Sequence, residues 1–115
     1  KEFLKNQVSA TFSGLNRDEL EKCIIAYEPV WAISSNPGAH PDTPESALES
    51  MAVIKNVVTN GYSLMANRYL YGGSVNSGNV RSFLAEDEVN GVLIGGASVD
   101  KDEFVKILSI VQELI

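Results

Sequence analysis

Residues 23–29, Cys-Ile-Ile-Ala-Tyr-Glu-Pro, form a short apolar run that ends in a glutamate and a proline. Two further runs follow, and each is closed by a pair of glycines: residues 69–74 read Tyr-Leu-Tyr-Gly-Gly-Ser, and residues 92–98 read Val-Leu-Ile-Gly-Gly-Ala-Ser. Near-continuous apolar runs of this length are typical of parallel strands that are covered on both faces. We therefore predict strands over 23–27, 69–71 and 92–94.

Helical patterns lie between and around these strands. Thr43, Pro44 and Glu45 give a capping hydroxyl, a first-turn proline and a first-turn acid, which together predict a helix start. The apolar residues after it recur at helical spacing, at Leu48, Met51, Ile54 and Val58. Asn60-Gly61 predicts the end of this helix.

Four more helical segments are expected. They are a helix over 2–12, a capped single turn over 16–20, a short helix through Val80, Phe83 and Leu84, and a last helix after Asp100. This last helix is predicted to carry its apolar residues on one side, at Phe104, Ile107, Leu108, Val111, Leu114 and Ile115. Alternation of helices and strands predicts an α/β fold with a parallel sheet. A sheet of three parallel strands has two exposed edges and cannot close on itself.

Composition restricts the partners. The chain has 115 residues and a formal net charge of -6, which argues against nucleic acid and anionic membranes as partners. It contains no apolar run long enough for a membrane span and no signal-peptide pattern, so we expect a cytoplasmic location. Cys23 is the single cysteine, cannot form an internal disulfide and is expected to be a small buried hydrophobe. The sequence contains no cluster of His, Cys or carboxylate residues that would predict a metal site.

Glu28 is the first candidate for chemistry. It follows a predicted strand, and active sites of parallel α/β folds lie at the C-terminal ends of the strands. A carboxylate there can act as a general base, although a solvated or helix-capping glutamate fits the same pattern. The two Gly-Gly turns predict either an anion cradle built from backbone N–H groups, with the Ser74 hydroxyl added, or merely tight strand-to-helix turns.

Two loop residues have weaker signals. His40 is the single histidine and lies in a loop rich in proline and glycine, where a solvated side chain is the expected state. Trp31 is expected to anchor the base of the same loop, with an exposed recognition role as the alternative.

The motifs become specific when they are taken together. The sequence Ala-Tyr-Glu-Pro-Val-Trp-Ala-Ile (26–33) resembles the signature around the catalytic base of triosephosphate isomerases. Residues 71–75 and 91–98 are similar to the ends of the next and the last strand of the same family. The resemblance covers nearly the whole chain. It implies a partial (β/α)₈ barrel, with residues 1–115 forming one incomplete segment that extends from the helix before strand six through the final helix.

The resemblance also implies roles for residues. The family interconverts dihydroxyacetone phosphate and glyceraldehyde 3-phosphate through an enediolate, without metal or organic cofactor; its glutamate base and its mobile lid are well-known examples of general-base catalysis and loop closure. Glu28 matches the catalytic base. The matching phosphate ligands are Ser34, Ser74, Gly95 and Gly96, and the matching lid and hinge residues are Pro29, Val30, Trp31 and Tyr71.

This chain departs from the family in two ways. Residues 34–42 are about three residues longer than the usual lid and contain two prolines, and Ser34 replaces a glycine. The family's asparagine, lysine and electrophilic histidine lie upstream of any position matched here, and His40 does not match that histidine. Because preorganised donors are each worth about 3 kcal/mol, we expect little or no activity from the chain alone.

Two assemblies are therefore expected. In the first, an N-terminal barrel portion completes the isomerase. In the second, copies of this chain pair into a catalytically inert homo-oligomer that keeps its capacity to bind phosphate. A chain that is molten on its own is a third possibility, because a domain of this size has a thin stability margin.

Overall fold

The computed structural model describes residues 1–59 and 68–115. The helices and strands in these ranges are α1 (Glu2–Phe12), α2 (Arg17–Leu20), β1 (Ile24–Tyr27), α3 (Pro44–Thr59), β2 (Arg68–Tyr71), α4 (Val80–Leu84), β3 (Gly91–Val92) and α5 (Lys101–Leu114). Short 3₁₀ turns, Val30–Ala32 and Gly96–Val99, follow β1 and β3. No helix within the described ranges is long and apolar enough to cross a membrane.

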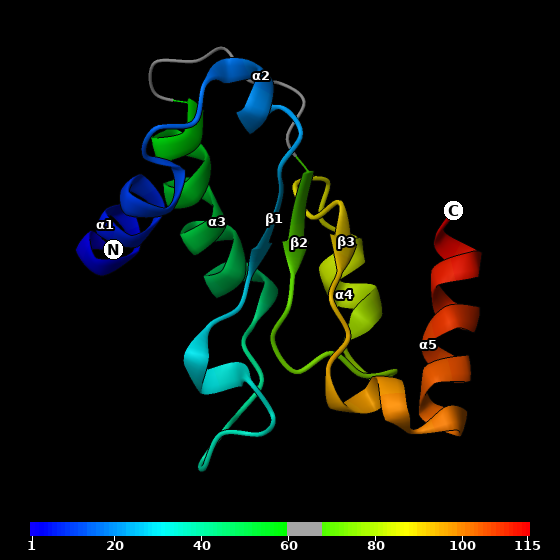
Figure 1. Ribbon diagram of the computed structural model, residues 1–115. Coiled ribbons are helices and arrows are strands. Elements are labelled where there is room, and N and C mark those ends of the chain that lie inside the picture. Colours follow the sequence, from blue (N-terminus) through cyan, green and yellow to red (C-terminus); the bar gives the residue numbers. More distant parts are fainter. Residues whose placement is uncertain (60–67) are drawn as a thin grey trace.

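The described strands form one parallel sheet in the order β1-β2-β3 (Figure 1). Tyr27 at the end of β1 lies beside Tyr71 at the end of β2, and Tyr71 lies beside Val92 of β3. The predicted α/β class, with three parallel strands alternating with helices, is confirmed. The third strand is shorter than predicted, because β2 ends at Tyr71 and the last bond between the two strands runs from the Leu93 amide to the Tyr71 carbonyl.

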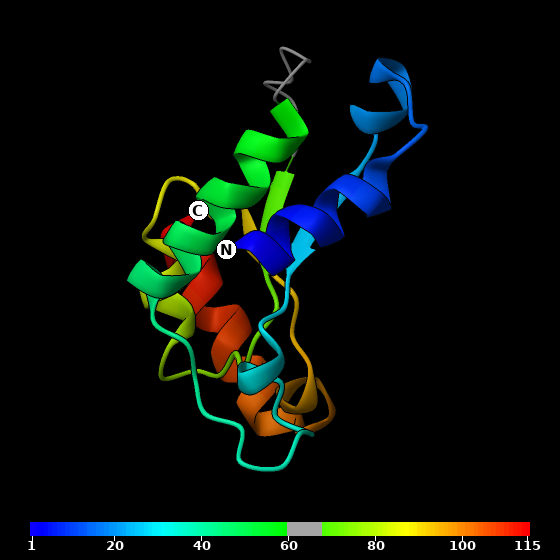
Figure 2. The ribbon, with the colours of Figure 1, turned by 90° about the vertical axis from the view of Figure 1, so that its left-hand side faces the viewer.

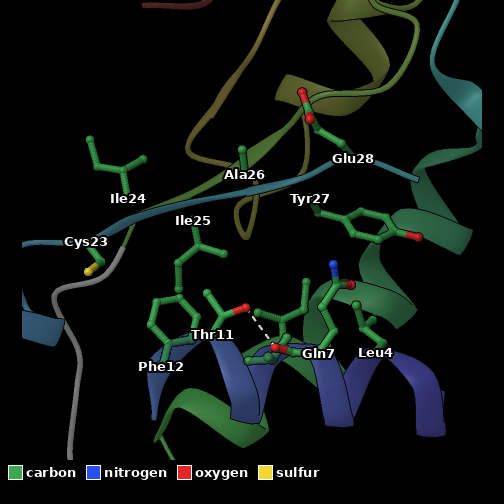
Figure 3. Close-up of a pocket in the computed structure, with 12 residues that line it drawn as sticks. Leu4, Gln7, Thr11, Phe12, Cys23, Ile24, Ile25, Ala26, Tyr27 and Glu28 are labelled. Atoms are coloured by element: carbon green, nitrogen blue, oxygen red, sulfur yellow. Dashed lines mark hydrogen bonds between the residues drawn. The ribbon is translucent and has the colours of Figure 1, made fainter. Parts of the chain in front are cut away.

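The sheet is covered on one face only. Along β1, Ile25 and Tyr27 are buried whereas Ile24 is 64% exposed, and along β2 the two tyrosines are buried beside an exposed Arg68. Figure 3 shows Ile25 and Tyr27 directed toward the helices and Ile24 directed the opposite way. The prediction of strands covered on both faces is therefore wrong for this chain. The physical reason is that the helices lie against one side, and nothing in the described ranges packs on the other.

The helix boundaries follow local capping. Asn16 and Glu19 form a reciprocal capping box at the start of α2, and the Thr43 hydroxyl accepts the Ser46 amide at the start of α3, at 3.2 Å. Asp100 caps α5 by accepting the Glu103 amide at 3.1 Å. Such caps satisfy amides that have no partner inside the helix and are each worth about 1 kcal/mol. The predicted stop of α3 at Asn60-Gly61 lies outside the described residues.

The core lies between the sheet and the helices. Its largest fully buried side chains are Tyr71, Phe83, Met51, Ile107 and Val80. The rings of Tyr71 and Phe83 stack with centroids 3.8 Å apart, which attaches α4 to the end of β2. Full burial of side chains of this size contributes about 1.5–3 kcal/mol each.

Helix α5 begins directly after Asp100, as predicted, and is only partly buried. Ile107 is buried, but Leu108 is 50% exposed and Ile115 is fully exposed. Part of the apolar surface of α5 is therefore open, because the helix packs on α4 and on the 3₁₀ turn before it (Figures 1 and 2).

Candidate active site at the strand ends

The loops that follow the three strands gather at one end of the sheet, the lower end in Figure 1. They enclose a hollow of about 490 Å³. Its lining residues are Glu28, Ile33, Ser34, Pro41, Gly72, Gly73, Ser74, Val75, Asn76, Gly95, Gly96 and Ala97. The hollow thus brings together the candidate base and all four candidate phosphate ligands, although they come from three separate loops.

Glu28 points away from α1 and α3, on the same side of β1 as Ile24 (Figure 3). Its side chain lies directly against the backbone of Gly72: a Cβ atom at Gly72 would come within 2.6 Å of the Glu28 Cγ and 2.9 Å of its Oε1. The Gly72 amide donates to the Tyr27 carbonyl at 2.8 Å, which fixes this turn against the end of β1. Gly72 therefore permits the close approach that positions the carboxylate.

The second glycine of this turn makes room for a different side chain. A Cβ at Gly73 would overlap the hydroxyl of Tyr71 and would come within 3.0 Å of the Ala32 Cβ. The end of β2 is thus packed against Ala32, at the end of the first 3₁₀ turn. The Ser74 hydroxyl strengthens this contact by donating to the Ala32 carbonyl at 2.6 Å.

The candidate phosphate ligands share one property. Within residues 1–59 and 68–115, the backbone amides of Ser34, Ser74, Gly95 and Gly96 donate no hydrogen bond. A Cβ at Gly96 would lie 3.3 Å from the Ser34 hydroxyl, so the first and third loops are in contact. Backbone amides without a partner that converge on one hollow suit an anion. The Ser74 side chain, predicted as a further donor, is instead engaged with Ala32 in this structure.

The long loop after β1 carries its own hydrogen bonds. The His40 amide donates to the Trp31 carbonyl at 2.9 Å, and the Asn36 side-chain amide donates to the Val30 carbonyl at 2.8 Å. Gly38 takes a φ of 70°, which favours glycine. The two ends of the loop are therefore joined to each other.

The side chains of the predicted hinge differ in burial. Pro29 is buried, while Val30 is 66% and Trp31 is 47% exposed. Trp31 fits both interpretations in part. Its backbone carbonyl anchors the base of the loop by accepting the His40 amide, whereas its indole ring is about half exposed. His40 is not buried and does not line the hollow, as predicted for a solvated loop residue.

Two tyrosines lie beneath the loop. Burial raises the pKa of Tyr71 to about 12, and the Asp42 charge adds to the increase. Burial also raises the pKa of Tyr27; the facing Ser50 hydroxyl opposes this increase, and Asp42 adds to it. Both phenols are therefore neutral at physiological pH.

A second hollow, of about 520 Å³, lies along the outer edge of β1 (Figure 3). It is bounded by one side of α1, including Leu4, Gln7 and Phe12, and by β1 through Glu28. Because β1 pairs only with β2 among the described strands, this edge presents unpaired strand backbone beside an apolar surface.

Sequence reasoning missed two residues near the first hollow. Asn76 lines it and accepts the amides of Gly78 at 2.8 Å and Asn79 at 3.1 Å, which shapes the loop after β2. The spacing Asn-Ser-Gly is a turn signal that pointed to this role. Asp42 is buried next to both tyrosines, and nothing in its local sequence indicates burial.

Comparison with known proteins agrees with this geometry. The family model described as triosephosphate isomerase matches residues 1–111. The chain belongs to the triosephosphate isomerase family. The family resemblance predicted from the three motifs is thereby confirmed.

Several curated triosephosphate isomerases are similar to this chain. That of Geotalea uraniireducens is 42% identical over 108 residues, which cover 91% of this chain and 42% of the relative. That of Aquifex aeolicus is 39% identical over 107 residues, with the same coverage of 91% and 42%. That of Dictyoglomus turgidum is 38% identical over 107 residues, covering 90% and 42%. The chain therefore spans about two fifths of the length of these relatives.

Proposed function

We propose that this chain supplies the base and the phosphate cradle of a triosephosphate isomerase. Glu28 is the catalytic base in this proposal, and Ser34, Ser74, Gly95 and Gly96 hold the phosphate of the substrate. The reaction interconverts dihydroxyacetone phosphate and glyceraldehyde 3-phosphate. One observation carries the proposal: a single hollow is lined by Glu28 together with four residues whose amides have no acceptor in the described ranges.

The chemistry asked of Glu28 is proton transfer between adjacent carbons. The carboxylate removes a proton from one carbon, an enediolate forms, and the same carboxyl group returns the proton to the neighbouring carbon. A fixed carboxylate can serve both carbons because they are directly bonded. The contact with Gly72 holds the Glu28 side chain at the edge of the hollow and limits its movement, which is what proton transfer between two adjacent carbons requires.

The remaining groups must come from outside this chain. The twelve residues that line the hollow include no lysine or arginine, so the developing oxyanion lacks a facing cation. The chain also spans about two fifths of the length of its relatives, and within residues 1–59 and 68–115 the sheet is open on one face and at both edges. We propose that the N-terminal barrel portion of an isomerase occupies this face and pairs with both edges. Residues 1–115 then form one segment of a closed barrel, whose lid includes Pro29, Val30 and Trp31 and is held at Tyr71.

A complementation assay tests this proposal. The purified chain is mixed with the part of the Geotalea uraniireducens enzyme that precedes the matched region, and isomerase turnover is followed. We expect no turnover from either part alone and measurable turnover from the mixture. Glu28→Gln should reduce the turnover of the mixture by at least about a hundredfold, because the amide cannot accept the proton.

The control separates catalysis from assembly. The Glu28→Gln chain must bind the N-terminal part as tightly as the original chain does, since the replacement preserves shape. Assembly without turnover in the original chain would contradict the assignment of Glu28 as a base. Absence of assembly would contradict the barrel-completing role.

A second candidate function rests on the exposed apolar side chains. Ile24 and Leu93 beside the open face are 64% and 45% exposed, and Leu108 of α5 is 50% exposed. Copies of this chain that cover one another would bury this surface and form an inert oligomer with phosphate affinity. Sedimentation of the chain alone distinguishes the two: one defined oligomer supports self-assembly, and a monomer contradicts it.

A further inference from the structure

The side chain of Asn79 makes its hydrogen bonds outside the helix that it begins. Asn79 is the N-cap residue of α4, a position at which an asparagine side chain usually accepts an amide from the first turn of its own helix. Among the described residues it makes no such cap. Its Oδ1 atom instead accepts the Asn76 amide at 2.9 Å, and its Nδ2 atom donates to the Ser74 carbonyl at 2.6 Å. Both ends of the side-chain amide therefore bind the loop between β2 and α4.

The start of α4 is held in place by other contacts. Val80 and Phe83 are buried, and the Phe83 ring stacks on Tyr71. The Ser82 hydroxyl donates to the Asn79 carbonyl at 2.7 Å. The helix is thus a fixed support from which the Asn79 side chain reaches the loop.

Ser74 is held from two sides. Its hydroxyl donates to the Ala32 carbonyl, and its own carbonyl accepts the Asn79 side chain. Because the side chain and the carbonyl are both fixed, the Ser74 nitrogen has little freedom to move. The Ser74 amide nevertheless donates no hydrogen bond within residues 1–59 and 68–115, and the residue lines the hollow at the strand ends. This is the arrangement of a donor that is oriented before its acceptor arrives.

We propose that Asn79 is a positioning residue for the phosphate cradle: its side chain fixes the Ser74 carbonyl and thereby presents the Ser74 amide to an anion in the hollow. The inference rests on the proposed function, because it assigns a supporting residue to one of the phosphate ligands named there. A donor that is ordered in advance binds more tightly than one that must be ordered when the anion binds. The bridge between two parts of one loop serves this purpose, and a cap on α4 would not.

Titration of inorganic phosphate into the isotope-labelled chain, followed by NMR, tests this role. In the original chain the amide signals of Ser74, Gly95 and Gly96 should shift along one binding curve. Asn79→Ser keeps a good capping residue for α4, but the short side chain cannot bridge Ser74 and Asn76. We expect it to raise the Kd for phosphate by about fivefold and to leave the thermal midpoint unchanged or higher. Equal affinity of the two chains would overturn the proposal.

The Ser74 amide signal of the phosphate-free chain gives a second readout. We expect one sharp signal in the original chain and a broadened or split signal in Asn79→Ser, because the Ser74 carbonyl then has no fixed donor. An unchanged signal would also overturn the proposal. If the original chain does not bind phosphate, the cradle in the proposed function is contradicted, and this signal still decides whether Asn79 fixes Ser74.

Ser82→Ala is the matched control. It removes the bond to the Asn79 carbonyl in the same turn of α4 without touching Ser74, so the Kd and the Ser74 signal should not change. Equal weakening in Ser82→Ala and Asn79→Ser would contradict the proposal, since the effect would then belong to the start of the helix. If Asn79→Ser does not fold, Asn79→Asp replaces it in the phosphate-free measurement. Aspartate keeps the oxygen that accepts the Asn76 amide but cannot donate to the Ser74 carbonyl.

Discussion

Single residues at this site are positioned mainly by what lies next to them. Glu28 follows a strand in the sequence, but its place at the hollow depends on the missing side chain of Gly72, 44 positions later along the chain. The Gly73 backbone likewise leaves room for the Tyr71 hydroxyl. The two glycines of this pair therefore have separate roles: Gly72 accommodates the proposed base, and Gly73 accommodates the tyrosine that we propose holds the loop.

Gly72→Ala should misplace the base. The new Cβ would lie 2.6 Å from the Glu28 Cγ, so the glutamate must move while the fold persists. In the complemented assembly we expect turnover to fall by about tenfold to a hundredfold, as displacements near 1 Å do elsewhere. We would measure kcat of the assembly, together with the thermal midpoint of the variant chain to show that it still folds.

Gly91→Ala is the matched control for this variant. Its Cβ would meet only the tip of the flexible Leu70 side chain, at 2.9 Å. A similar loss of turnover in both variants would contradict a specific role for Gly72.

At the level of elements, the helices and the loops at the strand ends stabilise one another. Glu103 in the first turn of α5 accepts the Ser77 amide of the loop after β2 at 2.6 Å. Arg81 of α4 pairs with Glu113 near the end of α5. These contacts connect α5 to the loops around the hollow, although the helix is far from them in sequence.

The Glu103 contact should make stability depend on pH. Hydrogen bonds from the Ser77 backbone and side chain lower the pKa of Glu103 from its ordinary value of 4.5. A depressed folded-state pKa contributes stability that is present above pH 4.5 and is lost as the pH falls through the folded value. Glu103→Gln should therefore lower the thermal midpoint at neutral pH and have little effect in strong acid, below the folded-state pKa.

Asp102→Asn is the matched control for Glu103. Asp102 shares the first turn of α5 and the same charge, but it is exposed. If both variants lose the same stability, the effect belongs to the helix dipole and not to the Ser77 contact.

For the whole molecule, the open face of the sheet is the dominant feature. An α/β sheet is normally covered on both sides, and a barrel achieves this for its inner face by closing on itself. Residues 1–59 and 68–115 place helices on one face of a sheet of three parallel strands, which are too few to close into a barrel. The chain spans about two fifths of the length of the curated relatives that it matches, and we propose that the remaining part of such a barrel covers this face.

Ile24→Lys should separate folding from assembly. Ile24 is 64% exposed, so the free energy of unfolding of the chain alone should change by less than about 0.5 kcal/mol. Binding of the N-terminal portion should weaken by at least about a hundredfold, because the lysine would be buried without a partner charge. Titration of the labelled N-terminal portion measures this affinity.

Phe3→Lys is the control for an exposed apolar residue elsewhere. Phe3 is 77% exposed and belongs to α1, the helix on the side of β1 opposite to Ile24 (Figure 3). Equal weakening by both variants would contradict binding at the sheet.

Local sequence determined the elements and the family. Signals that act over a few residues predict helices and strands from the sequence alone. They include the three apolar runs, the glycine pairs and the helix caps at Asn16, Thr43 and Asp100. Glu28 and the glycines could be predicted as site residues because strand ends of parallel folds meet at one edge.

Only the tertiary structure decided which faces are covered and which polar groups meet. Burial of Asp42, engagement of Ser74 by Ala32 and exposure of Ile24 depend on which segments, distant in sequence, pack against these residues. The apolar pattern of a strand does not show whether both of its faces are covered. Whether a given side chain is buried depends on what packs against it, and a local sequence does not contain that information.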